Sequence, residues 1–342
     1  MDKLSCARRL SLALSGDLSA LDRLPVIEWA SWWDLTLDRW HGEGFNKDMG
    51  SDERFDALGL DRHTQMWFNL KSRSCPAPQK QGGALIADEC DYERIKPLLY
   101  PEETLDFAQS ELAKIKQSHE RGERILWYTL EGGFWFPRTL LGIEGHLYSF
   151  YDEPELYKRI LDDLSDYQLR LLERVYSVAT PEFMTFAEDM SYNKGPMLSK
   201  KLFDEFLLPY YKKVIPYIKS HGTRVIVDSD GDITEMVPWL IEAGIEGALP
   251  LEFQAGVDVN ELKRRFPDFI LIGGFNKRVM KLGAEKMEEE FIRLLPAMRK
   301  GRFIPSVDHQ TPPDVSLENY RIYVELLKKY ARLAVSARGE EA

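Results

Sequence analysis

Three short β-like runs of this sequence end in side chains that could hold a metal ion or move a proton. These strand-end residues are Asp228 and Asp230 after the first run, Glu252 after the second, and Asp308 with His309 after the third. In α/β barrels a strand fixes the backbone, while the loop after it leaves the side chain free to act. Carboxylates with an imidazole suit zinc with an open position or a harder divalent ion. We therefore predict a metal or acid–base site, with Asp230, Glu252 and His309 as the metal ligands.

Helix capping bears on which of the two aspartates is free for chemistry. Asp232 and Glu235 form a capping box at the start of the next predicted helix. Neither Asp228 nor Asp230 is then needed as a cap. An unpaired carboxylate that ends an apolar strand is costly to bury, which favours a functional role for Asp228. The alternative for Asp230 is a turn in which its side chain binds its own backbone. We predict Asp228 as catalytic and leave open which of the two faces the site.

A fourth run ends in two adjacent acids, Glu188 and Asp189. Such a pair could orient a substrate hydroxyl, act as a general base, or lie behind the ligands of a metal. The alternative, helix capping around Ser199, would leave Glu188 unexplained. We predict both acids as catalytic residues.

Aromatic residues crowd the ends of other predicted strands. Five of them are predicted to contact the substrate: Trp29, Trp33, Tyr128, Trp135 and Tyr192. Rings at this density suit a flat substrate or a large ring. The alternative is that most of them are core or lid residues.

A glycine-containing loop follows the seventh predicted strand. Loops in this place often bind phosphate in barrels, and glycine lets a ligand approach the backbone. Four residues are therefore predicted to contact an anionic cofactor tail or an acidic partner protein: Gly274, Asn276, Lys277 and Arg278. A solvated helix start is the alternative.

The elements that would position these residues alternate along the chain. The predicted strands are 25–30, 60–68, 124–130, 183–188, 223–227, 247–252, 269–273 and 302–307. Their alternation with helices predicts a single α/β domain over residues 1–342, a (β/α)8 TIM barrel. A helical extension is predicted over 1–24 and a hairpin arm over 83–90. An open doubly wound sheet is the alternative, although no Gly-rich dinucleotide fingerprint opens a helix.

Composition narrows the range of partners. The 342 residues are 44% hydrophobic and 30% charged, as in a soluble globular protein. The net charge of −11 argues against nucleic acid or an anionic membrane surface as a partner. Three cysteines without metal spacing, a charged start and no bilayer-length apolar run make the cytoplasm the expected location. Whether the protein is a monomer or a homodimer is left open.

The segment 124–335 resembles the uroporphyrinogen decarboxylase-like superfamily, and within it the zinc- and cobalamin-dependent methyltransferases. The resemblance is carried by Asp189-Met190, Ser199, Pro209-Tyr210, the loop after Val227, Gly273-Gly274, Pro312-Pro313 and Leu317-Glu318-Asn319. In those methyltransferases zinc is held by a His-x-Cys at one strand end and a Cys near the last strand. Asp228 and Asp230 stand at the first two positions and His309 at the third. The resemblance thus implies a metal site here, for zinc or another divalent ion.

True decarboxylases of that superfamily carry an arginine-rich segment after the first strand, which holds the substrate carboxylates. Here residues 28–34 are aromatic and acidic, and would repel a polyanionic porphyrinogen. The resemblance therefore implies a corrinoid-dependent methyltransferase, with the cobalamin carried on a separate corrinoid protein. Because thiolate ligands are missing, we expect a metal that acts as a Lewis acid on a small O-methyl, for example methoxyaromatic, or N-methyl donor.

Other functions stay open. A metal-assisted lyase, decarboxylase or hydrolase on the same barrel would use Asp228 or Glu188 as a base and need no corrinoid. A transfer from methylcobalamin to another acceptor would run the methyl group the other way. A non-catalytic binding protein would tolerate the loss of Asp228 and His309.

Overall fold

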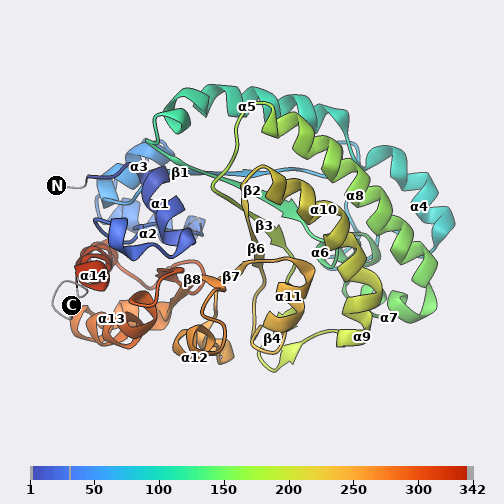
Figure 1. Ribbon diagram of the computed structural model, residues 1–342. Coiled ribbons are helices and arrows are strands. Elements are labelled where there is room, and N and C mark those ends of the chain that lie inside the picture. Colours follow the sequence, from blue (N-terminus) through green and yellow to red (C-terminus); the bar gives the residue numbers. More distant parts are fainter. Residues whose placement is uncertain (1–2, 31, 337–342) are drawn as a thin grey trace.

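The computed structural model describes residues 3–30 and 32–336 and has a TIM-barrel-like α/β fold (Figure 1). Its centre is a curled, parallel sheet of seven strands in the order β1-β2-β3-β6-β7-β8-β9. These strands are β1 (His63–Trp67), β2 (Ile125–Glu131), β3 (Phe183–Ala187), β6 (Arg224–Asp228), β7 (Gly247–Leu249), β8 (Ile270–Phe275) and β9 (Phe303–Val307). Two further short strands, β4 (Ser191–Tyr192) and β5 (Gly195–Pro196), pair as a small antiparallel hairpin.

Helices connect the strands and cover the outer face of the sheet (Figure 1). They are α1 (Cys6–Ser15), α2 (Asp34–Gly42), α3 (Ser51–Leu58), α4 (Glu89–Ile95), α5 (Glu102–Glu120), α6 (Trp135–Leu141), α7 (Ile143–Asp152), α8 (Pro154–Tyr176), α9 (Lys200–Leu202), α10 (Leu208–Ser220), α11 (Val237–Ala243), α12 (Val259–Arg265), α13 (Ala284–Met298) and α14 (Leu317–Ser336). Helix α8 packs between α5 and α10, and α13 packs on α14. Within the described residues, no helix has the length and apolar character needed to cross a bilayer.

The central strands are buried on both faces. Every residue of β3, β8 and β9 is buried. This is the pattern of a parallel sheet whose outer face is covered by helices and whose inner face is filled by side chains. Because the strands run in the same direction, their carboxyl ends meet at one rim of the barrel, where strand-end residues gather.

Residues 25–30, predicted as the first strand, bridge the edge strands β1 and β9 without forming a strand ladder. The N–H of Asp61, just before β1, donates to the carbonyl of Val26 at 2.8 Å. On the other side, the indole of Trp29 donates to the carbonyl of Val307 at 2.6 Å. The segment therefore completes the barrel through individual hydrogen bonds.

A buried carboxyl group helps to fasten this segment. Glu28 is only 2% exposed, and the hydroxyls of Ser306 and Tyr320 donate to it at 3.0 and 2.9 Å. Burial raises the pKa of Glu28 to about 8, although the two hydroxyl hydrogen bonds act in the opposite direction.

Two predictions for the N-terminal third can be compared with the structure. The helical extension expected over 1–24 contains α1 and a 3-10 turn at Leu18–Ala20, while its first two residues lie outside the described residues. The prediction of a hairpin arm over 83–90 was wrong, because this stretch is a loop that leads into α4. The loop is held by the N–H of Leu85, which donates to the carbonyl of Leu140 at 2.7 Å.

Candidate active site

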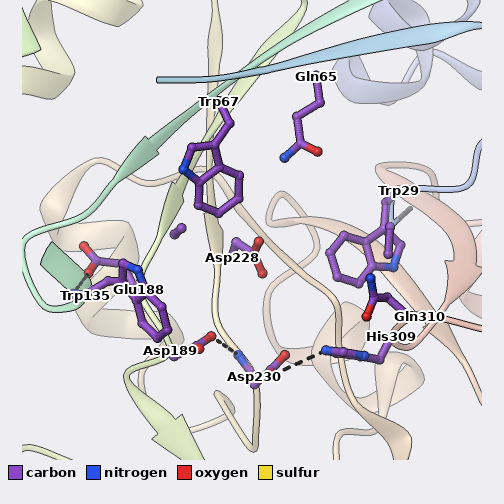
Figure 2. Close-up of a pocket in the computed structure, with 12 residues that line it drawn as sticks. Trp29, Gln65, Trp67, Trp135, Glu188, Asp189, Asp228, Asp230, His309 and Gln310 are labelled. Carbon is purple, nitrogen blue, oxygen red and sulfur yellow. Dashed lines mark hydrogen bonds and ion pairs between the residues drawn. The ribbon is translucent and has the colours of Figure 1, made fainter. Parts of the chain in front are cut away.

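A cavity of about 250 Å³ lies at the carboxyl ends of the strands. Figure 2 shows the side chains around it, which include four acids and three indoles: Glu188, Asp189, Asp228, Asp230, Trp29, Trp67 and Trp135. They come from the ends of β1, β3 and β6, from the start of α6 and from the N-terminal segment 25–30. The cavity is thus built where barrels of this kind place their chemistry.

Asp228 is the last residue of β6, and its carboxylate lies in the middle of the cavity wall in Figure 2. Within the described residues, no hydrogen bond or ion pair to this carboxylate is present. Burial raises the pKa of Asp228 well above its usual range, and the neighbouring Asp189 and Asp230 raise it further. This carboxyl group therefore faces the cavity without a protein cation to balance its charge.

Asp189 and Asp230 flank Asp228 and are linked to one another. The N–H of Asp230 donates to Oδ1 of Asp189 at 3.4 Å. Asp189 has a φ of +47°, in the left-handed region that aspartate tolerates better than most residues. Burial raises the pKa of both carboxyl groups, for Asp230 to about 7, and the acids oppose each other's ionisation. The site therefore holds protons at a pH where exposed aspartates have lost them.

His309 also lines the cavity, beside Trp29. Its Nε2 lies 3.6 Å from Oδ2 of Asp230. Burial lowers the pKa of His309, and the nearby Lys277 lowers it further. The imidazole is therefore mainly neutral at neutral pH.

Glu252, predicted as the third metal ligand, is engaged elsewhere. One carboxylate oxygen accepts the N–H of Gly231 at 2.9 Å, and the other accepts the side chain of Gln254 at 3.0 Å. Among the described residues, no three His, Cys, Asp or Glu side chains are grouped so that they could hold a metal ion. In this arrangement Asp230, Glu252 and His309 do not fit the predicted zinc or divalent-metal site.

Glu188 is buried, and its carboxylate binds the backbone of the loop that leads into α6. Its carboxylate accepts three backbone N–H groups, those of Gly133, Phe134 and Trp135, at 2.7–3.1 Å, and the hydroxyl of Tyr211. The approach is so close that a Cβ at Gly132 would lie 2.0 Å from the carboxyl carbon. Burial raises the pKa of Glu188 to about 7 against these hydrogen bonds. Glu188 therefore positions Trp135, with its carboxylate turned to the loop.

Asp308 holds neighbouring strand-end loops together. Its oxygens accept the N–H groups of Phe253 and Lys277, at 3.2 and 3.1 Å. The side chain is fully buried, and burial raises its pKa to about 6. Asp308 thus fixes the loops after β7 and β8 relative to β9.

The helix start predicted after β6 differs in the structure. Asp232 caps only a turn, by accepting the N–H of Thr234 at 2.9 Å. The regular helix α11 begins at Val237, with Pro238 in its first turn. Asp228 and Asp230 are free of capping, as the sequence indicated.

Of the five aromatic residues predicted to contact substrate, Trp29 and Trp135 line the cavity. The placement of Tyr128 needs correction: it is fully buried under the helices, where its hydroxyl donates to the carbonyl of Ala179 at 2.7 Å. Trp33 and Tyr192 are 42% and 47% exposed, at the start of α2 and on the β4–β5 hairpin, outside the cavity lining.

The loop after β8, predicted to contact a cofactor or partner, lies beside the cavity without lining it. Gly274 has a φ of +73°, and its carbonyl accepts the guanidinium of Arg293. The side chain of Asn276 accepts the N–H of Arg278, whose own side chain is exposed. Lys277 is half-buried, and its charge opposes the burial that raises the pKa of Asp230 and Asp308. The contacts predicted for these four residues stay predictions.

Five lining residues were not predicted from the sequence as site residues: Ala30, Gln65, Trp67, Ala187 and Gln310. Gln65 and Trp67 both lie on β1, two positions apart, so they share one face of the strand. The amide of Gln65 donates to Thr129 at 2.8 Å. The alternation along 63–67 was the signal that could have found them, together with their place at the start of the barrel.

This chain has a TIM-barrel-like fold with titratable side chains gathered at the carboxyl ends of its strands. TIM-barrel enzymes place their active sites at that end of the barrel. The chain belongs to the uroporphyrinogen decarboxylase (URO-D) family, whose match covers residues 108–330. This family is enzymatic. The matched region contains the acids of the cavity, Trp135 and His309, whereas Trp29 and Trp67 lie outside it.

Individual relatives are more distant. A uroporphyrinogen decarboxylase of Hydrogenobaculum sp. (strain Y04AAS1) is 28% identical over 138 residues, which are 39% of this chain and 38% of that protein. The chain therefore matches well under half of that relative's length. Among solved structures, a β-glycosidase from the hyperthermophile Thermosphaera aggregans aligns with a TM-score of 0.46 at 10% identity, over 80% of this chain and 82% of that one. The Flavobacterium johnsoniae chitobiase FjGH20 aligns with a TM-score of 0.35 at 10% identity, over 82% and 48%.

Proposed function

We propose that this protein is a methyltransferase that moves a methyl group from a small methylated donor to the corrinoid of a separate protein. Its membership of the URO-D family supports an enzyme of the decarboxylase and methyltransferase superfamily. The observation that carries the choice is the charge of the cavity. Three aspartates line it, and none of its described lining residues is Arg or Lys.

A porphyrinogen fits this cavity poorly. Its several carboxylates would meet Asp189, Asp228 and Asp230 with no lysine or arginine to balance them, and like charges at close range repel. The volume of about 250 Å³ also lies below the range usual for drug-sized ligands, which favours a small ligand over a macrocycle. A small donor is the better match.

The residues of the cavity can assist methyl transfer by handling a proton. An acceptor supplies the electron pair for the new bond to the methyl carbon, and the pair of the broken bond stays on the donor's oxygen or nitrogen. An oxygen leaving group needs neutralisation, which the protonated carboxyl groups of Asp228 and Asp230 could provide. The corrinoid would approach from the open side, where Trp67 is 49% exposed.

The test is a methyl-transfer assay with purified protein. Free cob(I)alamin is the acceptor, and the donors are a panel of methoxyaromatics and methylated amines, followed through the loss of cob(I)alamin absorbance. We expect donor-dependent loss with the unaltered protein and at least about a ten-fold slower rate with Asp228→Asn. A matched control is Asp106→Asn on α5, a 76% exposed acid remote from the cavity. If no donor in the panel caused a loss of cob(I)alamin absorbance, the proposal would be refuted.

A further inference from the structure

We propose that the methyl donor is a cation, a small quaternary ammonium that binds between the indoles of the cavity and the carboxylate of Asp228. The role of this cation as methyl donor rests on the proposed function. The binding of a small ammonium ion rests on the geometry of the cavity alone.

The first support is the aromatic wall. Trp29, Trp67 and Trp135 come from three separate elements, and Figure 2 shows their indoles on different sides of Asp228. An indole face attracts a cation through its quadrupole, and aromatic cages of this type recognise quaternary ammonium groups. The Trp135 ring already has one cation near it, since the guanidinium carbon of Arg138 lies 5.1 Å from its centroid.

The second support is the unbalanced charge. The carboxylate of Asp228 has no hydrogen bond or ion pair from the described residues, and it faces the cavity. Asp189 and Asp230 add negative charge on either side of it. A neutral donor would leave Asp228 without a counter-charge, whereas an ammonium ion supplies one.

Cations of the protein stand nearby but outside the lining. Lys277 acts on Asp230, and Arg138 acts on Asp189. Neither side chain lines the cavity, so the space between the indoles stays open to a ligand. Four acids line the cavity against these two neighbours, so its interior becomes negative as the acids ionise, and a bound cation favours their ionised form.

The third support is chemical. When the donor is a quaternary ammonium, the acceptor's electron pair forms the bond to the methyl carbon, the C–N pair stays on nitrogen, and a neutral tertiary amine leaves. No proton and no Lewis acid are needed for this leaving group. An ammonium donor therefore suits a site in which no three His, Cys, Asp or Glu side chains of the described residues are grouped to hold a metal ion.

The experiment compares two ligands of nearly equal shape that differ in charge. Choline and 3,3-dimethylbutan-1-ol are titrated into the full-length protein by calorimetry, without any corrinoid. We expect saturable binding of choline and at least about ten-fold weaker binding of the neutral alcohol. Glycine betaine, whose carboxylate would face the aspartates, should bind more weakly than choline.

Three variants at two positions locate the effect. Asp228→Asn should weaken choline binding by roughly ten-fold or more. Trp67→Leu should weaken it several-fold, whereas Trp67→Phe, which keeps an aromatic face, should bind nearly as well as the unaltered protein. Because Trp67 is half exposed, neither variant should unfold the barrel, and the thermal midpoint of each variant checks this.

The outcomes separate the inference from the proposed function. Equal binding of choline and its neutral isostere, or no binding of either, would overturn the cation inference even if methoxyaromatics still methylate cob(I)alamin. Selective binding of choline without transfer from any methylated amine would leave the binding of a cation standing and refute its role as donor.

Discussion

Nε2 of His309 lies 3.6 Å from Oδ2 of Asp230, although the two residues follow strands that are separated by β7 and β8 in the sheet. The pKa of the imidazole is lowered and that of Asp230 is raised to about 7, so near neutral pH the pair holds fewer charges than its sequence indicates. Both residues were predicted as metal ligands. In the structure they face one another across one side of the cavity.

The affinity for choline should depend on pH through the cavity acids. Their pKa values are raised, so below about pH 7 the cation must displace protons, and its affinity should fall by up to about ten-fold per pH unit. Besides one another, the charged groups that act on these acids are Glu252, Lys277 and Arg138, and His309 lies beside Asp230. Calorimetry between about pH 6 and 8 should show stronger binding at higher pH and proton release at the lower end. Tighter binding in acid would contradict the arrangement.

Replacing Glu188 separates positioning from proton transfer. Glu188→Gln would place an amide NH2 group where one carboxylate oxygen now accepts two donors, so we expect a loss of about 2–4 kcal/mol in the free energy of unfolding. Tyr211→Phe removes a single donor and should cost about 1–2 kcal/mol. Urea denaturation measures both. A Glu188→Gln protein of unchanged stability but abolished turnover would instead support the catalytic role predicted from the sequence.

Glu28 should make stability depend on pH. Its pKa is raised from 4.5 to about 8 in the folded protein, so between these values the folded chain holds a proton that the unfolded chain has lost. The free energy of unfolding therefore falls as pH rises through this window, by about 1.4 kcal/mol per unit from this group, and levels off above about pH 8. Glu28→Gln should remove that slope. Parallel curves for the two proteins between about pH 5.5 and 8 would disprove it.

Zinc should have little effect on the unaltered protein. Glu252 is held by Gly231 and Gln254, so forming the predicted ligand set requires breaking these hydrogen bonds. We expect no saturable rise in the thermal midpoint on adding zinc, and none of the choline affinity should be lost to a chelator. A saturable rise that disappears in His309→Ala would restore the metal site predicted from the sequence.

The acids of the site were predictable because each follows an apolar run. Strand ends at 228 and 307 placed Asp228 and His309 near one rim before any geometry was known. Tyr128 shows where such reasoning stops. Both faces of β2 are buried, so the sequence does not reveal which residues point inward, and a shift of one position exchanges the faces. The inward residue is Thr129, which binds Gln65, whereas Tyr128 points to the helices.

The hydrogen-bond partners of the acids could not be predicted from the sequence, for a related reason. Glu188 and Glu252 have the same strand-end context as Asp228, but their oxygens are taken by backbone N–H groups of loops that are distant in the chain. Which carboxylate stays unpaired depends on the course of those loops. The alternation of strands and helices in the sequence correctly predicted the barrel-like fold. The exception is the predicted first strand, 25–30, which is held by individual hydrogen bonds instead of a strand ladder.

The cavity combines residues from inside and outside the stretch that matches the family, and this bears on how its ligand preference can change. The acids lie within the stretch matched to the family, while Trp29 and Trp67 belong to the preceding part. A protein could keep the same chemistry and change its substrate by exchanging only the residues that precede the matched stretch. Ligand preference in such chains should be sought at the front of the sequence, in the two indoles that complete the wall.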